Sequence, residues 1–61
     1  MNDREYQIAA LAVKIAEFEL HMGNYTERDV YDWLIEADLS LTELMALDDI
    51  VAKIVEQSLG G

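Results

Sequence analysis

The chain has 61 residues, of which 52% are hydrophobic, and its thirteen acids against four bases give a net charge of −9. It has no cysteine and one histidine, which excludes disulfides and argues against a zinc site. A chain this short buries only about 60% of the surface that its unfolded state exposes. Association with another chain is therefore the most available source of further buried area.

The first predicted helix covers residues 3–22. Asn2 followed by Glu5 is a cap-like pair at its start, and Gly23 suits the left-handed position that ends a helix. One apolar seam, with alternating spacings of three and four, consists of Ile8, Leu11, Ile15, Phe18 and Met22. A second seam around the helix consists of Ala9, Val13, Ala16 and Leu20. Together the seams are wider than one neighbouring helix can cover.

The second predicted helix covers residues 27–38, and Thr26 with Asp29 forms its cap-like pair. Its apolar face has ordinary width and consists of Val30, Trp33, Leu34 and Ala37.

The third predicted helix covers residues 41–58, where Ser40 and Glu43 form the capping-box pattern. Its wide apolar face consists of Leu44, Leu47, Val51, Ile54 and Val55. Asp48 falls inside this face, which leaves open a break near Leu47 with Asp48 as the cap of a new helix.

These elements predict an all-α fold, a single small domain over residues 1–61 with a long, a short and a medium helix. Because the first and third helices carry more apolar surface than two neighbours cover, we expect copies of the chain to pack as a homo-oligomeric helical bundle, such as a dimer. The alternative is one monomer that covers both seams, with alanines at the close contacts. The expected self-association residues are Ile8, Leu11, Ile15, Phe18, Met22, Leu44, Leu47, Val51 and Ile54.

The sequence offers little for catalysis, which needs a nucleophile beside a base, acids with separated pKa values, or a metal. His21 stands near the end of the first helix, where a surface or capping role fits better than general-base work. Glu43, Asp48 and Asp49 could offer oxygens to a cation, but their spacing matches no calcium loop and favours a solvated edge. We therefore expect no enzyme activity, no metal site and no cofactor.

Residues 24–61 hold nine of the thirteen acids, and such a surface repels nucleic-acid phosphate and anionic lipid. Direct DNA binding is disfavoured because Lys53 is the only base of the third predicted helix. We expect instead a protein partner with a basic surface. The acids of the expected partner-binding face are Asp29, Asp32, Glu36, Glu43 and Asp49. Trp33 fits a core anchor and is also a candidate binding hot spot.

The composition favours a small acidic interaction module that self-associates and acts without chemistry, as a regulator, an inhibitor or an adaptor of a partner protein. One alternative is an acidic nucleic-acid mimic of viral or mobile-element origin that blocks a DNA-binding protein. Another is a structural subunit of a larger assembly. No apolar stretch approaches the ~20 residues of a membrane span, and no basic leader precedes an apolar core. We therefore expect a cytoplasmic location, or the host-cell interior for a viral accessory protein.

Overall fold

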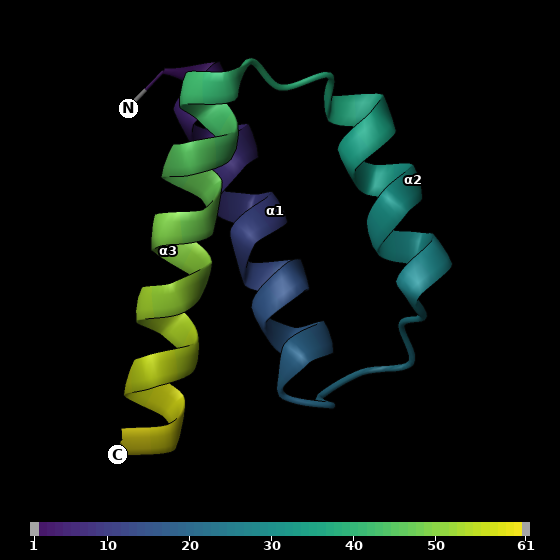
Figure 1. Ribbon diagram of the computed structural model, residues 1–61, viewed down its shortest axis with the longest axis vertical. Coiled ribbons are helices and arrows are strands. Elements are labelled where there is room, and N and C mark those ends of the chain that lie inside the picture. Colours follow the sequence, from purple (N-terminus) through teal and green to yellow (C-terminus); the bar gives the residue numbers. More distant parts are fainter. Residues whose placement is uncertain (1, 61) are drawn as a thin grey trace.

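The computed structural model describes residues 2–60, which form three helices: α1 (Asp3–Glu19), α2 (Glu27–Ala37) and α3 (Leu41–Gly60). Figure 1 shows α1 and α3 side by side and running in the same direction, while α2 runs the opposite way beside them. No strand occurs among these residues, so the predicted all-helical class is confirmed for them. Packing of copies into an oligomer stays a prediction.

The helices begin where short polar residues satisfy the free backbone N–H groups of the first turn. The Asn2 carboxamide oxygen accepts a hydrogen bond from the Glu5 N–H at 2.8 Å. Thr26 Oγ1 accepts from the Asp29 N–H at 3.3 Å, while the Asp29 carboxylate accepts from the Thr26 N–H at 2.9 Å. The two predicted starts at residues 3 and 27 are therefore confirmed.

The end of α1 comes at Glu19, earlier than the predicted residue 22. His21 takes the left-handed conformation, with φ of 58°. Its N–H donates to the Phe18 carbonyl at 3.1 Å, and the Met22 N–H donates to the Glu17 carbonyl at 2.8 Å. This pair of reversed bonds is the Schellman arrangement, which caps the last carbonyls of a helix.

The prediction that Gly23 would take the left-handed position is wrong, since no glycine among residues 2–60 has positive φ. The helix unwinds earlier, so that position falls on His21. Gly23 has a different role, because a Cβ atom there would lie 3.0 Å from the Tyr25 ring. At the end of α2 the left-handed residue is Asp38, with φ of 47°.

The core lies mainly between α1 and α3. Its buried members are Ile8, Leu11, Ala12 and Ala16 from α1, Ala37 from α2, and Leu47 and Val51 from α3. Ala12 and Ala16 are fully buried, and side chains this small allow two helices to approach closely. The alternative of a break near Leu47 does not occur, because α3 is continuous and Asp48 lies exposed on its outer side.

The middle helix α2 is held less firmly than its neighbours. Ala37 is its one buried residue, and Trp33 and Leu34 pack half-buried against the core. Tyr31 and Ile35 are exposed. Because so little apolar surface is buried, α2 gains less from packing than α1 or α3. None of the helices within residues 2–60 has both the length and the apolar character needed to cross a membrane.

Candidate functional site

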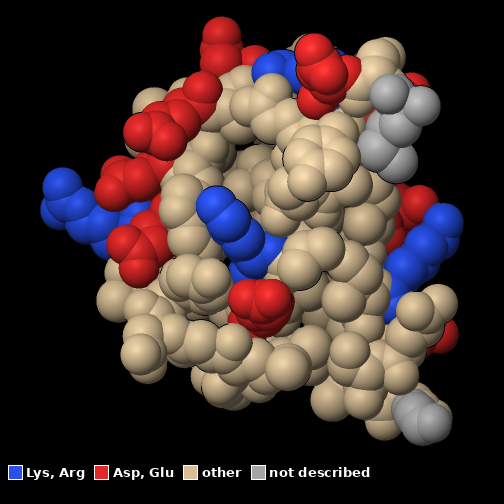
Figure 2. Space-filling view, turned by 180° about the vertical axis from the view of Figure 1, so that it is seen from behind, with Lys and Arg blue, Asp and Glu red and all other residues tan. Residues whose placement is uncertain are grey.

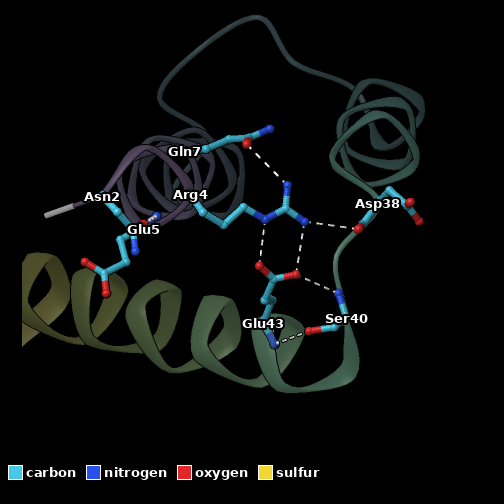
Figure 3. Close-up of polar contacts among 7 residues, drawn as sticks. All are labelled: Asn2, Arg4, Glu5, Gln7, Asp38, Ser40 and Glu43. Carbon is cyan, nitrogen blue, oxygen red and sulfur yellow. Dashed lines mark hydrogen bonds and ion pairs between the residues drawn. The ribbon is translucent and has the colours of Figure 1, made fainter.

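A polar junction joins the start of α1 to the loop between α2 and α3 (Figure 3). Arg4 on α1 donates from Nε to Glu43 Oε2 at 2.6 Å and from Nη2 to Glu43 Oε1 at 3.0 Å. Arg4 Nη2 also donates to the Asp38 carbonyl at 3.1 Å, and Nη1 donates to Gln7 Oε1 at 3.3 Å. One guanidinium therefore connects α1, the residue that follows α2, and the first turn of α3.

Glu43 also completes the predicted capping box of α3. Its N–H donates to Ser40 Oγ at 3.2 Å, and its Oε1 accepts from the Ser40 N–H at 2.9 Å. Hydrogen bonds from Arg4 and from the Ser40 N–H lower the pKa of the Glu43 carboxyl to about 2. The same contact raises the pKa of Arg4. Glu43 was expected on the partner-binding face, but its carboxylate is engaged within the chain.

A cleft of about 480 Å³ lies between α1 and α2. Its α1 side consists of Tyr6, Gln7, Ala10, Leu11 and Lys14, and its α2 side consists of Trp33, Glu36 and Ala37. Leu11 and Ala37 are buried and make an apolar floor, whereas the Tyr6 residue is 69% exposed. Gln7 connects the cleft to the junction, because it accepts the hydrogen bond from Arg4.

Trp33 is half-buried at this cleft between two partners. The Tyr25 ring meets it edge to face, with ring centroids 4.8 Å apart and planes at 82°. Lys14 Nζ lies 5.5 Å from the Trp33 ring centroid, a cation–π distance. Trp33 thus packs against the core and also lines an open cleft, while its role as a binding hot spot stays a prediction.

The acids expected on one face separate into two groups. Asp29, Asp32 and Glu36 lie on α2, and Glu36 lines the cleft. Asp49 lies on α3, where it pairs with Lys53 at 3.0 Å. Figure 2 shows acidic side chains in a row along the edge that α2 forms, beside a hollow in the surface. Three of the five acids predicted for a partner-binding face therefore share α2, and partner binding there stays a prediction.

The residues expected to mediate self-association are also divided. Ile8, Leu11, Leu47 and Val51 are buried within one chain. Ile15, Phe18 and Ile54 are half-buried, while Met22 is 64% and Leu44 37% exposed. The α1 and α3 seams therefore largely cover each other, and of this set Met22 and Leu44 stay exposed for contact with a second copy.

The outer face of α3 consists of one predicted residue, Leu44, and of Leu41, Met45 and Leu59. Leu41, Met45 and Leu59 are 75%, 65% and 76% exposed. The three share one side of the helix by their spacing of four and fourteen residues. Helical periodicity groups Leu41 and Leu59 on one shoulder of the predicted apolar face, and the same spacing adds Met45. The cleft and the Arg4 junction left no such local signal, because both join residues far apart in the sequence.

Within residues 2–60, no three histidine, cysteine or acidic side chains come together as metal ligands would. No protein-family model, curated protein or solved structure matches this chain. Its function is therefore argued from the geometry of the site.

Proposed function

We propose that the protein is a small non-catalytic interaction module whose acidic α2 binds a basic surface on another protein. The observation that carries this proposal is the state of the charged side chains. Arg4 is bonded to Glu43, Lys53 pairs with Asp49, and Lys14 lies over Trp33. No ion pair within residues 2–60 involves the acids of α2. Arg28 lies exposed on the same helix, so α2 carries four acids against one base. The Asp29 carboxylate caps the helix at the Thr26 N–H, whereas Asp32 and Glu36 are exposed and can attract a basic partner.

The chemistry of the described side chains supports a role without catalysis. His21 is exposed beyond the end of α1, and the hydroxyls of Thr26 and Ser40 accept hydrogen bonds at helix starts. Glu43, whose carboxyl has a strongly lowered pKa, is bonded to Arg4 and Ser40. Such groups serve folding rather than proton transfer.

Self-association is a second part of the proposal, favoured by the outer face of α3. Leu41, Leu44 and Met45 leave neighbouring apolar side chains in water at the start of α3, and monomers rarely expose large contiguous apolar patches. Sedimentation equilibrium at micromolar concentration tests it. We expect a dimer or higher oligomer that dissociates when Leu41 and Met45 are both replaced by Lys. A monomer for the unchanged chain would rule out this part.

Partner binding is tested by affinity capture from the native host with three forms of the chain. The first is unchanged, the second carries Asp32→Asn and Glu36→Gln, and the third carries Asp48→Asn and Glu56→Gln. Asp29 is kept in all three because its carboxylate caps α2. The second and third lose the same charge on different helices, so they are matched. We expect a basic protein to be retained by the first and third forms only.

Two outcomes would contradict the proposal: equal retention by all three forms, or retention of no protein by the unchanged chain. Adding DNA to the capture distinguishes the nucleic-acid mimic. If DNA releases the captured protein, the acids of α2 occupy its phosphate-binding surface. If DNA has no effect, the module binds elsewhere on the partner.

A further inference from the structure

We infer that the cleft between α1 and α2 receives a basic amphipathic helix from the partner protein, with one apolar side chain inserted between Tyr6 and Trp33. This inference rests on the proposed function and assigns it a site. The cleft combines the features of a protein-binding groove: a buried apolar floor at Leu11 and Ala37, two aromatic side chains, and polar side chains on both helices.

The charge beside the cleft selects the partner. Asp29, Asp32 and Glu36 are three and four residues apart, so they lie along one side of α2, one helical turn from each other. Lysines or arginines at the same spacings on a second helix would face them when the two helices lie side by side. A helix with bases on one side and large apolar residues on the adjacent side could pair with the acids and also pack on the apolar floor of the cleft.

The architecture favours a helix over an extended segment. Residues 2–60 contain no strand, so they offer no sheet edge for strand addition. Every lining residue of the cleft belongs to α1 or α2, and none belongs to α3. An added helix would therefore pack against α1 and α2 on the face that Figure 2 shows.

Lys14 determines how such a helix would be oriented. Its amine lies over Trp33 at one end of the cleft, whereas Glu36 lines the other wall. A base of the partner is repelled near Lys14 and attracted near Glu36 and Asp32. Removal of the Lys14 charge should therefore strengthen binding of a basic helix in the cleft. If the helix bound to acids far from the cleft, the same change would have a much weaker effect.

The test uses the full chain and a synthetic peptide of about 18 residues, made of leucine and lysine in an amphipathic helical order. Its control has the same composition in alternating order, which cannot form a helix with one apolar face. Trp33 is the chain's single tryptophan, so its fluorescence reports binding at the cleft. We expect the helical peptide to shift Trp33 emission and to bind at least about five-fold more tightly than its isomer.

Four variants locate the site. Asp32→Asn with Glu36→Gln should weaken binding about five-fold or more, and Lys14→Gln should strengthen it about two- to five-fold. Asp48→Asn with Asp49→Asn should change it little. Ala10→Glu places a longer side chain at an exposed position of the cleft while it adds a negative charge. Docking in the cleft predicts weaker binding by this variant, whereas attraction by net charge alone predicts tighter binding.

The inference is overturned if the isomer binds equally well, if Ala10→Glu binds more tightly, or if NMR shift changes map to Leu41, Met45 and Leu59 instead of the cleft. The last result would assign the peptide to the outer face of α3. Failure of the proposed function looks different, because no basic host protein would then depend on the α2 acids. If capture of a host protein depends on the α2 acids while peptide binding causes no change at the cleft residues, only this inference is contradicted.

Discussion

His21 is a non-glycine residue at a backbone position that favours glycine. Its φ of 58° brings Cβ close to the following carbonyl, which costs an ordinary residue roughly 1–2 kcal/mol. The hydrogen bonds from His21 and Met22 back to the last turn of α1 hold it there. The side chain is exposed and was expected to serve a surface role, so its replacement tests the backbone alone.

His21→Gly should stabilise the protein by about 0.5–1 kcal/mol, because glycine accepts the left-handed conformation but loses more freedom on folding. Urea unfolding followed by circular dichroism measures the change. His21→Ala is the control, since it removes the imidazole and keeps the Cβ atom. Equal stability of the Gly and Ala variants would show that the conformation carries no such strain.

Glu43 links the acidity of the solution to the stability of the fold. Its pKa is lowered from 4.5 to about 2, so the folded chain releases this proton more readily than the unfolded chain. The stabilisation is fully present above pH 4.5 and is lost as the pH falls toward 2. Its side chain keeps 25% exposure and that of Arg4 keeps 40%, so solvent screens part of the effect.

Glu43→Gln should therefore lower the unfolding midpoint in urea at pH 6 and have progressively less effect between pH 4.5 and 2. The measurement is a series of urea titrations across this range for the unchanged chain and the variant. Glu56→Gln, an exposed acid of α3 outside the junction, is the control. A loss of stability that is the same at pH 6 and pH 2 would contradict the pKa assignment.

Among the helices, α2 combines the acidic face with the smallest buried surface. Helices that bury little open locally at lower free energy than the rest of a fold. Ala37 is its one buried residue, whereas α1 and α3 bury four and two residues against each other and α2. The element that we propose for binding is therefore also the one most able to adjust to a partner.

Backbone amides in the middle of α2 should exchange with deuterium faster than those in the middle of α1 and α3, by about ten-fold or more. Exchange followed by NMR under native conditions measures this, and α3 is the internal reference. Equal protection in all three helices would mean that the chain opens only as a whole.

The elements with local signals were predictable from the sequence. Cap pairs lie three residues apart, so Thr26 with Asp29 and Ser40 with Glu43 identified the starts of α2 and α3. The end of α1 was placed at residue 22 because Gly23 was the nearest glycine, while the backbone turns at His21. Periodicity also identified the apolar seams, but it shows which residues share a face and not which neighbour covers that face.

The candidate site was predictable only in part for the same reason. Spacing on α2 grouped Asp29, Asp32 and Glu36 correctly on one side of a helix. The cleft exists because α2 does not pack closely along the whole of α1. The spacing of these two helices depends on side chains from both, so no local sequence pattern predicts it. Lys14 belongs to the site because its amine contacts Trp33, which is nineteen positions away in the sequence.

The whole molecule measures 29 × 25 × 18 Å, and this small size makes its net charge of −9 important for stability. At 0.01 M salt the screening length is about 30 Å, so every acid repels every other across the fold. At 1 M it is about 3 Å, and only neighbouring charges interact. Two ion pairs within residues 2–60 offset little of this repulsion.

The melting temperature should therefore rise as sodium chloride increases from about 0.01 M to 1 M, since relief of repulsion outweighs the loss of exposed ion pairs. Thermal unfolding by circular dichroism measures it. The chain with Asp29→Asn, Asp32→Asn and Glu36→Gln should show a smaller rise, because it carries less charge. A melting temperature that falls with salt would show that the ion pairs dominate.

The parallel pairing of α1 with α3 has a consequence for how fast the chain reaches its native state. Arg4 and Glu43 are 39 positions apart, and the buried faces of the two helices are separated by a similar length of chain. Nearly the whole polypeptide must close into a loop before this interface forms, and loop closure opposes collapse until then. Folding should consequently be slower than in a helical hairpin of equal size, where sequential helices meet first.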